Sequence, residues 1–139
     1  MRFVVGETEL LIPVDRSAGF GRGHTNQLVK SMSEHENVLI AFTSCPSKSE
    51  ANRLAKALVM EKLAACINQI PGVTSTYIWR DQLQTDSEVV LMMKTTANRF
   101  EALQRRVKEL HPYELPELIA IPVCAGAENY LAWVRDTVT

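Results

Sequence analysis

The order of strand-like and helix-like segments after residue 37 most constrains the fold of this chain. A continuous apolar run, Val38 to Phe42, is typical of a central strand that is covered on both faces. Ser47 stands three residues before Glu50, which is the spacing of a capping box, and helical periodicity continues from there to about Leu63. The sequence therefore predicts a strand followed by a helix.

A long hairpin is expected next. β-branched and aromatic residues predict an extended segment from Ala64 to Trp79, with a bend or bulge at Pro71-Gly72. Residues 80–86 are polar and predict a turn, after which residues 88–95 predict a second long strand. Such a hairpin would project beyond a domain this small.

The last third predicts a helix, a strand and a helix. Apolar residues at helical spacing run from Phe100 to Leu110, and Pro112 ends this helix at His111. Residues 118–121 form an apolar run between two prolines, as in an edge strand, and a short helix follows Gly126. The complete order predicts an α+β fold, a ferredoxin-like βαββαβ sandwich with an extra C-terminal helix and both main helices on one face of the sheet. The uncovered face and the long hairpin favour oligomerisation through the sheet.

Residues 1–36 differ from the rest of the chain. Gly19, Gly21 and Gly23 resemble a phosphate loop, but the Gly-Lys-Ser/Thr of that loop and the strand–helix context of a dinucleotide fingerprint are missing. We expect residues 1–36 to be an N-terminal extension, flexible or not native, and residues 37–139 to be the folded domain.

Bulk properties exclude several classes of function. The net charge of -1 gives no basic field for nucleic acid, and no apolar run approaches the roughly 20 residues of a membrane span. Three cysteines without a C-x-x-C pair, and an N-terminus without a secretory signal, indicate a reducing compartment. We therefore expect a cytoplasmic protein that neither binds nucleic acid nor inserts into a membrane.

Two groups of residues are able to carry chemistry. Tyr77 and Trp79 share one face of their strand, where they either anchor an interface or line a ligand pocket with Glu88 or Lys94. The segment from His111 to Glu117 concentrates an imidazole, a phenol and carboxylates between prolines, and is either a rigid connector or a source of acid–base groups or metal ligands.

The cysteines are read by their positions. Cys45 precedes a predicted helix N-terminus, a place that can lower a thiol pKa, which makes it the best candidate for a metal-binding sulfur. Cys66 and Cys124 are expected to be core thiols. Because no paired zinc-ligand spacing, Ser-His-Asp order or nucleophile elbow is present, we expect a binding protein rather than an enzyme.

From Val38 to Thr139 the sequence resembles the CutA family of divalent-cation tolerance proteins. The segments that carry the resemblance are Glu61-Lys62-Leu63-Ala64-Ala65-Cys66, Tyr77-Ile78-Trp79, Glu88 with Lys94-Thr95, His111-Pro112-Tyr113-Glu114-Leu115-Pro116-Glu117 and Tyr130-Leu131-Ala132-Trp133. The resemblance implies a tight homotrimer similar to the PII-type signalling proteins, with sheets joined across subunits by the long hairpin. It also implies tolerance of copper and other divalent ions; animal members are treated as partners in anchoring a membrane enzyme.

The sequence departs from the family pattern at two places. Some bacterial members carry a cysteine directly after the first strand and a His-His pair before Pro-Tyr, where this chain has Thr43 and Leu110-His111. Relatives usually have a glycine in the hairpin turn, where this chain has Arg80-Asp81. Asp tolerates left-handed turn geometry, so the turn itself is expected to form.

These observations predict a trimeric divalent-metal tolerance protein that binds copper, or another divalent cation such as zinc, weakly through His111 and Cys45. The alternative is a PII-like sensor or scaffold that binds a small anionic ligand or a protein partner in clefts between subunits. Those clefts would be lined by Tyr77, Trp79, Lys94, Tyr113 and Glu117.

Overall fold

Residues 37–139 are the part of the chain that this computed structural model describes, and the expectations for residues 1–36 lie outside it. The helices and strands of this part follow the predicted order. They are β1 (Val38–Cys45), α2 (Lys48–Met60), β2 (Cys66–Trp79), β3 (Gln82–Thr96), α3 (Ala97–Leu110), β4 (Ile119–Pro122) and α4 (Glu128–Thr137).

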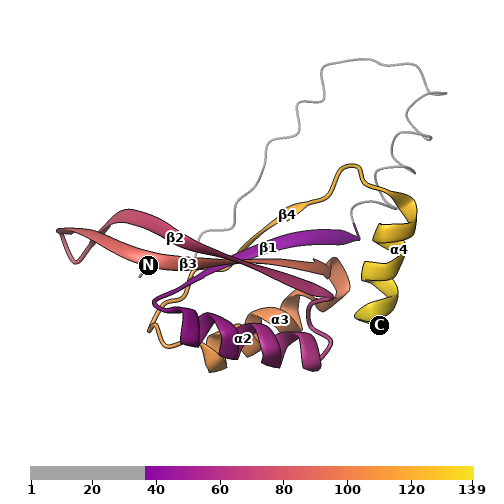
Figure 1. Cartoon of the computed structure of the whole chain (residues 1–139), viewed down its shortest axis with the longest axis horizontal. Helices are drawn as coiled ribbons and strands as arrows, with labels where there is room; N and C mark the ends of the chain where they lie inside the picture. The colour runs from indigo at the N-terminus through magenta and orange to yellow at the C-terminus, as the bar shows by residue number, and fades with distance from the viewer. Residues whose placement is uncertain (1–36) are drawn as a thin grey trace, which may run out of the picture.

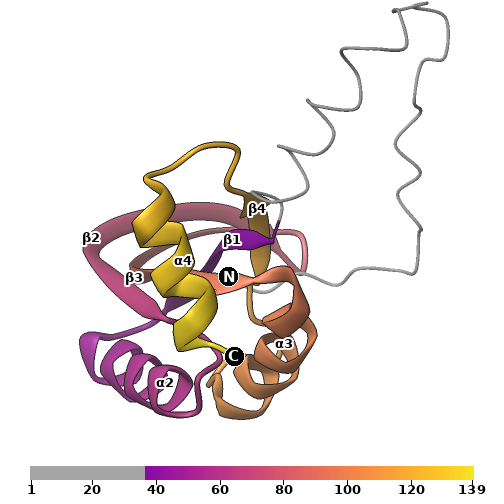
Figure 2. The same cartoon turned by 90° about the vertical axis from the view of Figure 1, so that its right-hand side faces the viewer.

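The strands form one antiparallel sheet in the order β2-β3-β1-β4. Helices α2 and α3 lie side by side on one face of it, and α4 packs at its end (Figure 2). This arrangement confirms the predicted ferredoxin-like α+β sandwich with an added C-terminal helix. The short strand β4 lies at the edge, where Pro122 ends it without breaking an interior ladder.

The core lies between the sheet and the two main helices. Alternate residues of β1 and β3 point toward the helices, because successive side chains of a strand face opposite sides. The fully buried contacts join Ala41, Cys45, Leu91 and Met93 of the sheet to Leu54, Leu58, Leu103 and Val107 of the helices. A second, smaller cluster packs Leu131, Val134 and Val138 of the C-terminal segment on Val38 and Ala65.

The other face of the sheet is apolar and uncovered in the single chain. Ile121 pairs with Ile40, and Ile119 pairs with Phe42, so these side chains share the face away from the helices. Ile119 is 56% exposed and Ile121 is 51% exposed. The prediction that the first strand is covered on both faces is therefore wrong for one subunit alone, where α2 and α3 cover one face.

Two predicted boundaries were wrong. Helix α2 ends at Met60 rather than near Leu63, because Lys62 adopts a left-handed conformation with φ of 57° that stops the helix. The hairpin turn contains only Arg80 and Asp81, whose φ values are 49° and 62°, instead of residues 80–86. The polar residues after Asp81 belong to β3, which lies in solvent beyond the core. Their polarity therefore resembled that of a turn, although they continue to pair with β2.

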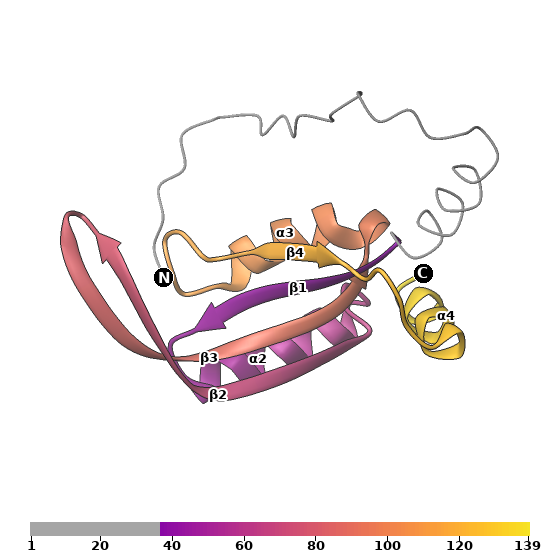
Figure 3. The ribbon, with the colours of Figure 1, turned by 90° about the horizontal axis from the view of Figure 1, so that it is seen from above.

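The hairpin of β2 and β3 extends well past the helices (Figures 1 and 3). Its pairing shifts register between Ile70 and Val73, where Gly72 has a φ of 72°, and this confirms the predicted bulge. Between the bulge and the turn, the two-residue turn sets the pairing, and Tyr77 and Trp79 lie on the same face of the hairpin as Gln84, Asp86 and Glu88.

Candidate functional site

His111 sits at the C-terminal end of α3, where Pro112 prevents the helix from continuing. Its side chain is buried, with 7% exposed. The reason is that the connector folds back over the end of β1. Nε2 lies 2.8 Å from the carbonyl oxygen of Ser44, and the backbone N–H of Tyr113 donates to Nδ1 at 3.1 Å.

These two contacts fix the protonation state of the ring. A carbonyl only accepts, so Nε2 carries the proton, whereas Nδ1 accepts and has none. The imidazole is therefore neutral. Burial lowers the pKa of His111 below its usual 6.5, although the Ser44 carbonyl partly opposes this shift.

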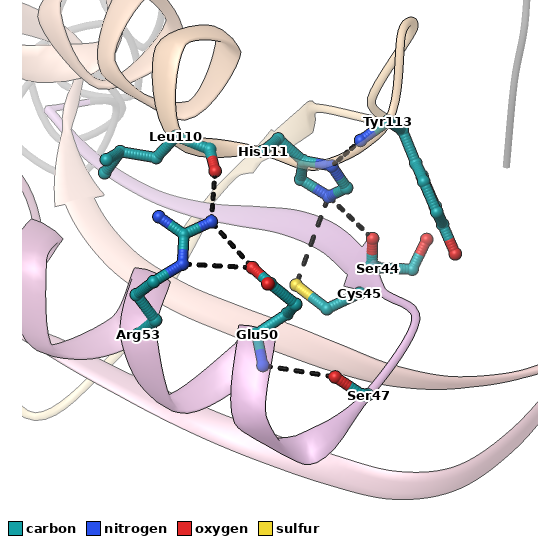
Figure 4. A network of polar contacts seen from close by, with 8 residues as sticks. All are labelled: Ser44, Cys45, Ser47, Glu50, Arg53, Leu110, His111 and Tyr113. Carbon is teal, nitrogen blue, oxygen red and sulfur yellow. Dashed lines mark hydrogen bonds and ion pairs between the residues drawn. The ribbon is translucent and has the colours of Figure 1, made fainter.

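Cys45, at the end of β1, lies directly against His111, with Sγ 4.0 Å from Nε2 (Figure 4). The structure thus brings together the two residues predicted as metal ligands. Burial, followed by the nearby charges of Glu50 and Glu88, raises the pKa of the Cys45 thiol to about 11. The expected lowering of this pKa by the start of α2 was wrong, because the thiol is buried and the first turn of α2 brings the negative charge of Glu50 near it.

A polar network holds this pair in place (Figure 4). Ser47 caps α2 by accepting a hydrogen bond from the Glu50 backbone N–H at 3.2 Å, as the sequence predicted. The guanidinium of Arg53 donates to the Glu50 carboxylate and also to the carbonyl oxygen of Leu110. The start of α2 is thereby tied to the end of α3, which fixes the backbone next to His111.

Cys45 and His111 form only part of a metal site. Among residues 37–139, no group of three or more His, Cys, Asp or Glu side chains lies close enough to hold a metal ion. Glu117 instead accepts a hydrogen bond from the Ser44 hydroxyl at 3.1 Å, and Glu114 lies 3.9 Å from Arg80. One thiol and one imidazole suit weak binding of a soft or borderline ion better than a closed structural site.

A cavity of about 540 Å³ lies near this pair, where the outer part of the hairpin faces Pro46 and Tyr113. We call it the aromatic cavity, and its lining residues are Pro46, Tyr77, Trp79, Gln84, Asp86, Ser87 and Tyr113. The Tyr77 hydroxyl donates to Asp86, and the Tyr113 hydroxyl donates to Glu88 at 3.0 Å. Glu88 is only 1% exposed. Burial and this hydrogen bond both raise the pKa of Tyr113.

Three of the five predicted cleft residues therefore lie together, namely Tyr77, Trp79 and Tyr113. Lys94 lies elsewhere on the sheet, with Nζ 3.9 Å from Cys66 Sγ, and Glu117 faces Ser44. A cleft that includes all five would need a neighbouring subunit, so it stays a prediction.

Sequence reasoning missed Asp86 as a cavity residue. A hairpin with a two-residue turn at Arg80-Asp81 places Asp86 on the same face as Tyr77. Counting residues from such a turn was the signal in the sequence that could have identified Asp86. The cysteine predictions also need correction. Cys66 is half-buried and Cys124 is exposed, because Cys124 lies beyond the edge strand rather than in the core.

Comparison with known proteins gives a consistent result. The family model described as "CutA1 divalent ion tolerance protein" matches residues 39–137. The divalent-cation tolerance protein CutA of Thermus thermophilus is 45% identical over 97 residues, which are 70% of this chain and 94% of that protein. Human protein CutA is 46% identical over 100 residues, which are 72% of this chain and 56% of the human protein. The crystal structure of CutA from Xylella fastidiosa has a TM-score of 0.73 at 40% identity, covering 74% of this chain and 99% of that one.

Relatives are named for different compartments. A periplasmic divalent cation tolerance protein from Archaeoglobus fulgidus has a TM-score of 0.71 at 33% identity, covering 73% of this chain and 99% of that one. A chloroplastic protein CutA from Arabidopsis thaliana is 32% identical over 91% of this chain and 70% of its own length. None of the helices described here is long and apolar enough to cross a membrane.

Proposed function

Because this chain belongs to the CutA1 divalent ion tolerance family, we propose that it is a trimeric tolerance protein that binds copper ions weakly through Cys45 and His111. The observation that carries this proposal is the 4.0 Å approach of Cys45 Sγ to His111 Nε2. A thiolate favours cuprous ion, and imidazole suits both copper and zinc. Zinc is the second ion to test.

The geometry explains why binding should be weak. The imidazole must give up its contact with the Ser44 carbonyl before Nε2 can bind a metal, and the thiol must lose its proton although its pKa is about 11. Both steps oppose binding. A third ligand would have to come from water or from a neighbouring subunit.

Two features of the single subunit support the trimer. The sheet face with Ile119 and Ile121 is apolar and exposed, and a contiguous apolar face of this kind favours association. The hairpin also extends beyond its own core (Figure 3), where it can pair with or cover a second subunit. Both features lie on the sheet, and neither lies on the outer surfaces of α2 and α3.

A second candidate is a PII-like sensor or scaffold, and the aromatic cavity favours it. Ligand sites are typically cavities of roughly 300–1,000 Å³ with mostly apolar walls and a few polar groups. The volume of the aromatic cavity falls in this range, and its walls combine aromatic rings with the polar side chains of Gln84, Asp86 and Ser87. In either case we propose that the protein acts in the cytoplasm by binding and not by catalysis, in line with relatives that are named for tolerance of ions.

Native mass spectrometry of the full chain with cuprous ion, and separately with zinc, tests the first proposal. We expect a mass of three times the 15.6 kDa subunit and up to one copper ion per subunit at micromolar metal. A monomer would overturn the trimer. A trimer that binds no copper under these conditions would overturn the metal proposal and leave the sensor as the better account.

A further inference from the structure

We propose that the aromatic cavity binds a small organic cation, an ammonium or guanidinium compound that carries an apolar group. This inference deepens the second candidate, because it rests on the cavity being a ligand site and names the chemical class of its ligand. It does not depend on metal binding at Cys45 and His111.

The walls of the cavity suit a positive charge. Tyr77, Trp79 and Tyr113 supply three aromatic rings, whose faces attract cations when these lie within about 6 Å of a ring centroid. The protein itself already makes such a contact at the rim, since the guanidinium carbon of Arg80 lies 5.5 Å from the centroid of the Trp79 ring. Arg80 is therefore an internal example of the kind of group that this ring accepts.

The charged residues that line the cavity or lie under it are carboxylates, whereas the cation at its rim, Arg80, also lies 3.9 Å from Glu114. Asp86 is the one charged residue among the described residues that line it. Glu88 lies beneath Tyr113 and is connected to the cavity through the phenol of that residue. Hydrogen bonds between a carboxylate and an ammonium or guanidinium group are short and strong, so Asp86 is the natural partner for the charged end of a ligand.

Two hydrogen-bond donors of the cavity, the phenols of Tyr77 and Tyr113, are already used within the protein. The phenols of Tyr77 and Tyr113 each donate their only proton to a carboxylate, so both present oxygen lone pairs to a ligand. These oxygens and the Asp86 carboxylate favour a ligand with N–H donors over an anion. Lys94, the cation that an anionic ligand would need, lies next to Cys66 instead. The class of ligand inferred here is thus opposite in charge to the one expected from the sequence.

Calorimetric titration of the full chain with three matched probes tests this inference. The probes are benzylamine, benzyl alcohol and benzoate, which share a ring and differ in charge, and a metal chelator is present throughout. We expect benzylamine to bind at least about tenfold more tightly than the other two, since hydrogen bonds to charged groups contribute that much. Equal or tighter binding of benzoate, or no binding of benzylamine at millimolar concentration, would overturn the inference.

Two substitutions identify the site. Asp86→Asn removes the charge and keeps an acceptor for Tyr77, so we expect benzylamine affinity to fall at least about tenfold. Asp81→Asn is the matched control, because Asp81 lies outside the cavity in a left-handed turn that Asn also tolerates. This variant should bind benzylamine as tightly as wild type does. Unchanged affinity in Asp86→Asn would overturn the assignment.

A third substitution covers the case in which Asp86→Asn does not fold. Trp79→Leu removes a ring wall from a half-buried position on the hairpin and should weaken benzylamine at least several-fold. Unchanged affinity would overturn the inference. Copper titration of the same protein without chelator measures the metal proposal separately, so failure of one proposal does not imply failure of the other.

Discussion

The hydroxyl of Tyr113 donates a hydrogen bond of 3.0 Å to the buried carboxylate of Glu88. This contact fastens the connector between α3 and β4 to strand β3. The Tyr113 ring also lies 4.9 Å, centroid to centroid, from the ring of His111 and forms one wall of the aromatic cavity. One residue thus joins the Cys45–His111 pair to the cavity, and a change at Tyr113 should affect both.

Tyr113→Phe should lower the free energy of unfolding by about 1–3 kcal/mol, because Glu88 stays buried and loses a donor. Urea unfolding followed by circular dichroism measures this change. Tyr130→Phe is the control, since Tyr130 is 43% exposed, and it should change stability by less than about 0.5 kcal/mol. Equal effects of the two substitutions would show that the Tyr113–Glu88 contact contributes nothing specific.

Acid should destabilise the protein through His111. Its pKa is lowered in the folded state, so the unfolded chain takes up a proton first as the pH falls through about 6.5. The stabilising contribution is complete above that pH and declines below it, with a slope of at most about 1.4 kcal/mol per pH unit.

The variant His111→Gln tests this sign. Glutamine can donate to the Ser44 carbonyl and accept from the Tyr113 N–H, but it does not titrate. Between pH 7 and 5, in the presence of a chelator, wild type should therefore lose more stability than the variant. Parallel pH profiles would contradict a buried neutral imidazole.

The sequence predicted the order of helices and strands well, because the apolar patterns are strong in elements that bury one face in the core. Val38 to Phe42 and residues 88–95 belong to the two central strands, where alternate apolar residues such as Ala41, Leu91 and Met93 are buried under the helices. It failed at the hairpin, where residues 82–87 extend beyond the core and have no apolar period to reveal a strand. Asp86 was lost from the candidate site for the same reason.

The state of the predicted metal ligands was harder to predict. The sequence correctly placed His111 after a helix. It did not predict the contact between His111 Nε2 and the backbone carbonyl of Ser44, because these residues are 67 positions apart. Burial then raised the pKa of Cys45, although its position before a helix favoured the opposite. Tertiary contacts of this kind override the effect that a residue's position in the chain has on its pKa. The proximity of Cys45 to His111 was therefore predictable only through the family resemblance.

Ile121→Lys should disrupt the proposed trimer. The side chain lies on the uncovered apolar sheet face, where a second subunit would bury an unpaired charge. Sedimentation should show the mass falling from three times 15.6 kDa toward 15.6 kDa. Met60→Lys is the control, because Met60 is 82% exposed at the end of α2, away from that face. If Ile121→Lys remains a trimer, the subunits associate through another surface.

A chain that begins at Met32 should keep its assembly and its melting temperature within about 3 °C of wild type. The reason is that the two buried clusters of the described part draw their side chains from residues 38–138. Differential scanning calorimetry compares the two chains. A larger loss would show that residues 1–31 pack on this core.

The proposed metal site requires that cuprous ion bind at Cys45, and a competition titration against a colorimetric cuprous chelator tests this. All proteins should carry Cys124→Ser, because Cys124 is exposed and would bind copper independently. Cys66→Ser is the matched control, since this thiol is half-buried and adjoins Lys94 rather than His111.

In that background we expect weak copper binding that Cys45→Ser abolishes and Cys66→Ser leaves unchanged. Binding should weaken steadily as the pH falls from 8 to 6, because copper must displace the proton of the Cys45 thiol, whose pKa is about 11. Copper binding that is as strong in Cys45→Ser as in the parent protein would contradict the site.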